Sequence, residues 1–169
     1  TAHLHHPLLG EAVELGIPTV AINRTPADSP VSTVAPDNEA GVADLVAHLA
    51  TLGHRHIANI AGPSDTSTGQ ARTASFRAAL RRHGLPELPE LWVEADVYST
   101  AAGVRAARLL LQRGESFTAV VTGNDLLALG VIDVLRENRI DCPGQVSVAG
   151  FTDLPMMDRV SPTLTTVRV

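Results

Sequence analysis

The chain has 169 residues, of which 44% are hydrophobic, 18% charged and only 3% aromatic, a composition that excludes a disordered protein and favours helices layered on a sheet over an aromatic-rich β-sandwich. The formal net charge of −5, without a dominant basic patch, excludes strong nucleic-acid binding by this chain alone. The single cysteine, Cys142, excludes an internal disulfide and is compatible with the cytoplasm, and no run is long and apolar enough to span a membrane.

Predicted strands and helices alternate along the chain. Short apolar runs predict the strands, whereas apolar residues three and four apart, with Asp, Asn, Ser or Thr before them and Gly after them, predict the helices. This alternation predicts right-handed βαβ units, and therefore an α/β fold with a doubly wound parallel sheet buried on both faces. In chain order, we expect strand 17–23, a Pro-bounded connection over 29–37, helix 38–54, strand 56–62, helix 69–85, strand 89–96, helix 99–114, strand 117–123, helix 124–139, strand 145–151 and strand 164–169.

The carboxyl ends of the predicted strands lead into polar loops, which read GPSDTSTGQAR, TGND and GFTD. Ligands of open parallel sheets bind beyond these ends, so we expect one polar site there. Arg72 and Asn124 lie near helix starts at this edge, and with Asp96 and Asp153 they are typical of a site that binds hydroxyl groups. Taken singly, Asn124 is equally explained as a helix cap and Arg72 as an ordinary surface cation, so only their convergence favours a site.

Signals for catalysis and for metal binding are weak. The sequence contains no dinucleotide-binding, P-loop or nucleophile-elbow motif. His54 and His56 precede a strand, at the end of the sheet opposite the predicted site, and with His48 they do not form a recognisable ligand spacing. The remaining histidines near the start, His3, His5 and His6, look incidental. We therefore expect no catalytic residues, no metal and no cofactor.

Several segments together resemble a known family. They read IPTVAINR, DNEAGVADLVAHLATLGHRHIANIAGP, RTASFRAAL, FTAVVTGNDLLALGVIDVLRENRIDCPGQVSVAGFTD and SPTLTTVRV. In order and spacing, from about Gly16 to the end, they are similar to the effector-binding core of lactose/galactose-repressor (LacI/GalR) transcription factors. The elements HLxxLGHRxI, NDxxAxG and PxLTTV are jointly specific for this resemblance.

The resemblance implies a type I periplasmic-binding-protein-like fold of two lobes with a small-molecule effector in the cleft between them. Residues 1–35 would be a remnant of the N-terminal lobe, and residues 36–169 nearly all of the C-terminal lobe. The chain starts without Met, and we expect a fragment whose DNA-binding helix-turn-helix lies outside it. Operator DNA would then be contacted only through that missing domain, in a cytoplasmic protein.

The resemblance also assigns residues. The family's effector contacts fall on Arg72, Asn124 and Thr152, but Thr152 stands where an acidic residue is usual. Val97 stands where an aromatic is frequent, and Asn23 where Asp is common. A hydroxyl accepts less strongly than a carboxylate, so we hypothesise a smaller, less polar or differently oriented ligand than a typical sugar. The predicted effector-binding set is Asn23, Arg24, Thr68, Arg72, Asp96, Val97, Asn124, Thr152 and Asp153.

A homodimer is a further implication of the family. The helix over 125–138 has more apolar surface than one sheet contact needs, and we expect Leu129, Met156 and Met157 to face the partner. Two alternatives remain open: a secreted solute-binding protein of the same fold, which needs an upstream signal peptide, and an enzyme of doubly wound fold. The residues of the motifs HLxxLGHRxI, NDxxAxG and PxLTTV favour the transcriptional regulator over these two alternatives.

Overall fold

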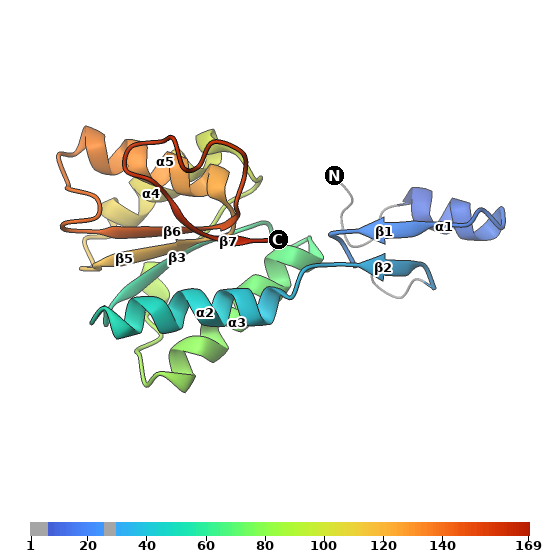
Figure 1. Cartoon of the computed structure of the whole chain (residues 1–169), viewed down its shortest axis with the longest axis horizontal. Helices are drawn as coiled ribbons and strands as arrows, with labels where there is room; N and C mark the ends of the chain where they lie inside the picture. The colour runs from blue at the N-terminus through green and yellow to red at the C-terminus, as the bar shows by residue number, and fades with distance from the viewer. Residues whose placement is uncertain (1–6, 26–29) are drawn as a thin grey trace.

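A computed structural model describes residues 7–25 and 30–169 of the chain, and it has two parts of very different size (Figure 1). The small N-terminal part contains α1 (Pro7–Glu14), β1 (Val20–Ile22) and β2 (Ser32–Val34). The large part contains α2 (Asn38–Thr51), β3 (Ile57–Ala61), α3 (Ser67–Arg82), a 3₁₀ turn (Pro89–Leu91), β4 (Trp92–Glu94), α4 (Thr100–Gln112), β5 (Ala119–Thr122), α5 (Asp125–Glu137), β6 (Ser147–Thr152) and β7 (Thr165–Arg168).

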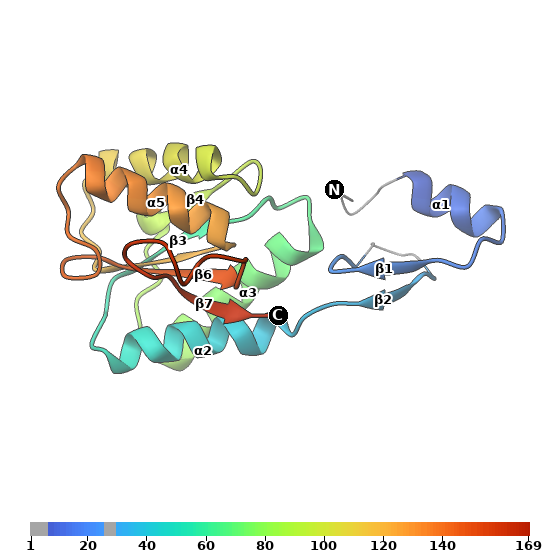
Figure 2. The same cartoon turned by 45° about the horizontal axis from the view of Figure 1, so that its top comes forward.

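The large part is a five-stranded parallel sheet in the order β4-β3-β5-β6-β7, which confirms the predicted doubly wound α/β architecture. Helices α2 and α3 cover one face of the sheet, and α4 and α5 cover the other (Figure 2). Successive side chains of β5 therefore enter different cores. Val120 packs under α4 and α5, whereas Ala119 and Val121 pack under α2 and α3.

Short-range capping fixes the helix starts. The Asp37 carboxylate accepts from the backbone N–H of Ala40 at 2.9 Å, and the hydroxyl of Thr66 accepts from that of Gly69 at 3.1 Å. Because Thr66 supplies this cap, α3 begins at Ser67, slightly earlier than predicted. Ser99 caps α4 in the same way.

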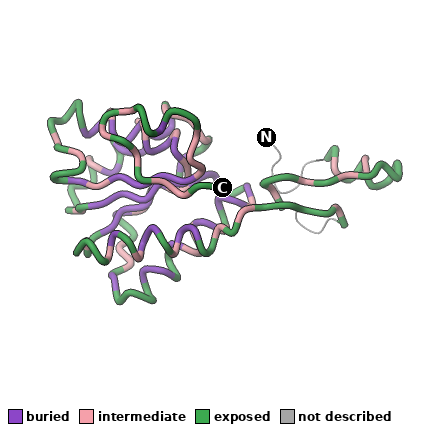
Figure 3. The backbone as a smooth tube through the Cα atoms, viewed as in Figure 1, coloured by how far each residue is buried: buried purple, intermediate pink, exposed green. Residues whose placement is uncertain are grey.

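The N-terminal strands depart from the prediction. The expected buried strand over 17–23 is only three residues long, and Val20 and Ile22 are 58% and 75% exposed. It pairs in parallel with β2, all of whose residues are exposed as well (Figure 3). The apolar run does predict a strand, but within the described residues its two large apolar side chains are left mostly exposed and only Ala21 is partly buried.

The helices of the described residues are all too short or too polar to cross a bilayer.

Candidate functional site

The carboxyl ends of the parallel strands meet at one edge of the sheet, and the arrowheads of β6 and β7 point toward the N-terminal part (Figure 2). Gly62 follows β3, Gly123 follows β5, and Thr152 ends β6. This is the edge where the strand-end loops predict a site.

Arg72 lies at this edge and is not a surface cation. It is only 8% exposed, although it belongs to the first half of α3. Its Nε donates to the side-chain oxygen of Asn38 at 2.8 Å, and its Nη1 donates to the carbonyl of Gly123 at 2.5 Å. The guanidinium also lies 3.8 Å from the ring centre of Phe151. These contacts hold the charged group rigidly where β5, β6 and α2 meet.

Burial lowers the pKa of Arg72 to about 10, and the nearby charge of Arg24 lowers it as well, whereas Tyr98 and Asp125 act in the opposite direction. At neutral pH the side chain remains a cation. Its Nη2 has no protein acceptor among the described residues, so Arg72 has hydrogen-bond donors left for a ligand.

Tyr98 is a second aromatic side chain at this edge, in addition to Phe151, and the prediction of Val97 missed it by one residue. Val97, assigned from the resemblance, is 49% exposed. The Tyr98 ring instead packs against Gly62, where an added Cβ would lie 2.0 Å from the tyrosine oxygen. Gly123 also lies close to Gly62, since a Cβ on Gly123 would lie 2.7 Å from the backbone nitrogen of Gly62. The glycines that end β3 and β5 were the signal that could have pointed to a flat side chain here.

Arg24 brings the N-terminal part to the same edge. Its guanidinium donates to the hydroxyl of Thr68 and lies 5.5 Å from the ring centre of Tyr98. The Thr68 and Tyr98 oxygens are 3.5 Å apart. The backbone N–H of Thr25 donates to the hydroxyl of Ser67 at 2.8 Å, so the first residues of α3 bind the N-terminal part through two side chains.

Asn124 caps α5, which confirms the alternative explanation for this residue. Its side-chain oxygen accepts from the backbone N–H of Leu127 at 3.0 Å. Its amide nitrogen has no acceptor among the described residues, so capping does not exclude a ligand contact. Thr122 supports this turn, because its hydroxyl is 2.8 Å from the carbonyl of Asn124.

Asp125 is completely buried next to Asn124, and it was not among the residues predicted for the site. Its carboxylate accepts from the backbone N–H of Leu154 at 2.7 Å and from the hydroxyl of Thr166 at 2.5 Å. Gly150 allows this approach, since a Cβ there would lie 2.4 Å from an Asp125 oxygen. Asp125 therefore ties the loop after β6, and strand β7, to α5.

Thr152 and Asp153 form a sharp turn after β6, with φ of 126° and 57°. A positive φ is costly for a β-branched residue, so the Asp125 contacts that follow are needed to hold the turn. The Asp153 carboxylate accepts from Nε of Arg168 at 2.5 Å. This hydrogen bond and the negative charge of Asp153 raise the pKa of Arg168. The carboxylate is thus already paired within the chain.

Three predicted residues lie apart from this cluster. Asp96 forms an ion pair with Arg105 at 2.6 Å, and its side chain is 72% exposed. This pairing on the surface argues against a ligand contact for Asp96. Val97 is half exposed, as described above. Asn23 adopts a positive φ of 62° at the end of β1, where its backbone N–H donates to Val34, and it is exposed.

The residues expected to face a dimer partner also differ. Met156 is 65% exposed and Leu129 is half-buried, so both are accessible. Met157 is only 7% exposed, because it packs within its own chain, and its carbonyl accepts from the N–H of Leu164 at 3.2 Å. A side chain buried in this way offers little surface to a partner, which argues against the expectation for Met157.

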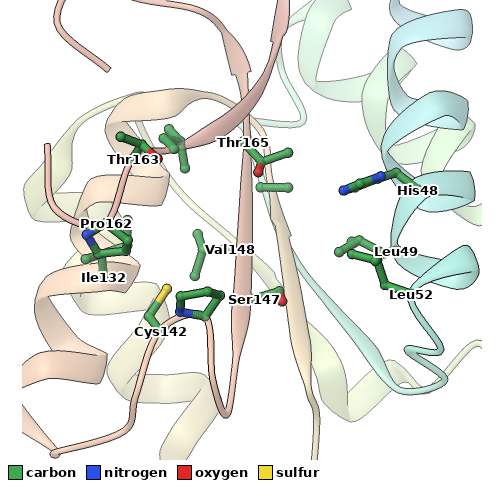
Figure 4. Close-up of a pocket in the computed structure, with 13 residues that line it drawn as sticks. His48, Leu49, Leu52, Ile132, Cys142, Ser147, Val148, Pro162, Thr163 and Thr165 are labelled. Carbon is green, nitrogen blue, oxygen red and sulfur yellow. The ribbon is translucent and has the colours of Figure 1, made fainter. Parts of the chain in front are cut away.

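A cavity of roughly 390 Å³ lies at the other end of the sheet (Figure 4). It lies along β6 on the side of β7, because β7 begins opposite Ala149 and the start of β6 is paired only with β5. Its walls are mostly apolar and include His48 and Cys142. The described residues contain no group of three or more His, Cys, Asp or Glu placed to hold a metal, and His3, His5 and His6 lie outside them.

Comparisons with known proteins agree with this geometry. A family model described as a periplasmic binding protein-like domain matches residues 46–169. The HTH-type transcriptional regulator CelR of Thermobifida fusca is 35% identical over 168 residues, which are 98% of this chain and 49% of CelR. The HTH-type transcriptional regulator AscG of Escherichia coli K12 is 32% identical over 152 residues, which are 90% of this chain and 45% of AscG.

A solved structure of a CelR–cellobiose complex superimposes with a TM-score of 0.93 at 34% identity, covering 99% of this chain and 52% of that one. The chain spans about half the length of the curated relatives that it matches. These relatives are named as regulators and not as enzymes. The chain therefore belongs to the periplasmic-binding-protein-like family, and within it to the LacI-type group.

Proposed function

We propose that this chain is the effector-binding part of a LacI-type transcriptional regulator, and that a small sugar-like metabolite binds at the carboxyl ends of the strands. The observation that carries the proposal is the buried guanidinium of Arg72, fixed by Asn38 and Gly123, with donors left over beside Tyr98. A planar fork of donors next to an aromatic face suits the hydroxyl groups and the apolar face of a sugar ring. The cellobiose in the CelR complex supports this chemistry by analogy.

The contact set proposed for the ligand is narrower than the one predicted from the sequence. Arg72, Asn124 and Thr152 would contact it from the large part, and Arg24 with Thr68 from the junction with the N-terminal part. Tyr98 replaces Val97 as the aromatic surface. Asp96 is left out because of its ion pair with Arg105. Asp153 and Asn23 would not contact the ligand directly. Asp153 would hold the loop after β6 through its ion pair with Arg168, and Asn23 would hold the turn that ends β1.

The regulatory role follows from the two-part arrangement. A ligand held by Arg24 on one side and Arg72 on the other would favour one relative placement of the two parts. It can shift that equilibrium only by its difference in affinity for the two placements. Operator DNA would be contacted by a segment outside this chain, and a homodimer would carry the change to it, with Met156 and Leu129 at the interface. The relatives named as HTH-type regulators support this reading over a solute-binding protein.

Thermal unfolding of the whole protein against sugars, sugar phosphates, polyols and nucleobases tests the proposal. A ligand that binds only the folded state stabilises it by about 2.7 kcal/mol at a concentration of one hundred times its Kd. We expect a hit whose midpoint shift disappears in Arg72→Ala and persists in Arg105→Ala, because Arg105 only forms an exposed ion pair. A sharp transition with no hit, or a hit indifferent to Arg72, would contradict the proposal.

A further inference from the structure

Two guanidinium groups lie at the same edge of the sheet, and the hydrogen-bond partners that the described residues offer them are neutral. Arg24 binds the hydroxyl of Thr68 and the ring face of Tyr98. Arg72 binds an amide oxygen, a backbone carbonyl and the ring of Phe151. Thr68 and Arg72 lie on the same face of α3, one turn apart, so the side chain that anchors Arg24 is a direct neighbour of Arg72.

Three carboxylates near this edge accept from groups other than Arg24 and Arg72. Asp153 is paired with Arg168, and the Asp125 oxygens accept from Leu154 and Thr166. Asp37 caps α2. Among the described residues, no carboxylate lies within ion-pair distance of either guanidinium. Thr152, at the end of β6, adds a hydroxyl and no negative charge.

Two cations therefore lie at this partly buried edge, and among the described residues neither forms an ion pair with a carboxylate. A buried cation without a counter-charge is costly, and the proximity of a second cation adds to the cost. Burial and the charge of Arg24 lower the pKa of Arg72, whereas Tyr98 and the Asp125 carboxylate raise it, so the positive charge of the two guanidinium groups is only partly offset. An anionic group on a ligand would offset the remaining positive charge, since guanidinium groups bind oxyanions through charge-assisted, often bidentate hydrogen bonds.

We propose that the ligand of this site is anionic: a sugar-like molecule carrying a phosphate or carboxylate group that Arg24 and Arg72 bind together, with its ring against Tyr98. The inference rests on the proposed effector-binding function and names the ligand class of that site. It also accounts for Thr152, because a carboxylate at this position would repel such a ligand.

The test measures the binding of matched neutral and charged sugars to the whole protein by calorimetry at constant ionic strength. Pairs of a sugar with its phosphate, and of a sugar with its aldonic acid, distinguish the phosphate from the carboxylate. We expect a charged member to bind more tightly than its neutral counterpart. Arg24→Gln should weaken that binding about 10-fold to 100-fold, as expected for the loss of a charge-assisted hydrogen bond.

Matched variants separate charge from structure. Arg24→Lys keeps the charge and should retain most of the affinity, whereas Arg105→Gln removes a cation from an exposed pair and should leave binding within 2-fold. Binding of a neutral sugar no weaker than its charged counterpart would overturn the anion proposal and leave the effector function standing. A folded protein that binds neither kind of ligand would overturn both.

Discussion

Strands β1 and β5 have similar apolar sequences and opposite environments. Val20 and Ile22 of β1 are mostly exposed, whereas every residue of β5 is buried. The difference lies in what surrounds each strand. β5 has a strand on both sides and a helix layer on both faces, while β1 has one three-residue neighbour. A parallel strand is thus stabilised by its layers, not by its own sequence.

The largest difference between the two parts should appear in the free energy of unfolding when a large apolar side chain of each part is truncated to alanine. Leu127 is completely buried between α5 and the sheet, so Leu127→Ala should lower the free energy of unfolding by about 2–5 kcal/mol. Ile22→Ala, at an exposed position of β1, should change it by less than about 0.5 kcal/mol. Urea denaturation followed by circular dichroism measures both. A similar loss in the two variants would mean that β1 is packed in solution as tightly as the large sheet.

An intermediate loss of stability should follow when the contacts that hold β7, at the edge of the large sheet, are removed. β7 is only partly buried, and Asp125 ties it to α5 through Thr166. Asp125→Ala should cost about 1–3 kcal/mol, because the N–H of Leu154 and the hydroxyl of Thr166 lose their acceptor.

Asp133 provides the control for this prediction. It lies on the same helix but forms only an exposed pair with Arg136 at 3.4 Å, so Asp133→Ala should be nearly neutral. Hydrogen exchange would add resolution, since Asp125→Ala should speed exchange in β7 more than in β5. Equal acceleration of both strands would show that Asp125 supports the whole sheet and not its edge.

The smallest effect expected is a pH dependence of stability that comes from His54, at the opposite end of the large sheet. His54 follows α2, and its two ring nitrogens lie 2.8 Å from the hydroxyl of Thr118 and 3.1 Å from that of Ser147. Burial, and then the nearby His48, lower the pKa of His54 below 6.5. The unfolded chain therefore binds the proton more readily, and stability is lost as the pH falls from 6.5 toward the folded-state pKa.

His54→Gln isolates this contribution, because glutamine keeps hydrogen-bonding groups and does not titrate. The midpoint of thermal unfolding should fall less between pH 7.5 and 5.5 in the variant than in the parent protein. Equal falls would assign the pH dependence to other groups. Residues 7–25 and 30–35 of the N-terminal part include no histidine, so no such contribution is expected from them.

The sequence by itself determined the elements, their order and the edge that carries the site. Caps such as Asp37 and Asn124, and the alternation of apolar residues, act within a few residues of the chain, so they can be read directly from it. The tertiary structure decided which groups are buried or paired. Arg72 is buried because Asn38 and Gly123, distant in sequence, converge on it.

Two further details depended on long-range packing. Tyr98, and not Val97, reaches the site because two glycines from other strands leave room for its ring. The exposure of β1 likewise could not be read from its apolar sequence, which is that of a buried strand. Local patterns specify which conformation a segment prefers, whereas burial and charge compensation depend on neighbours that only the folded chain brings together.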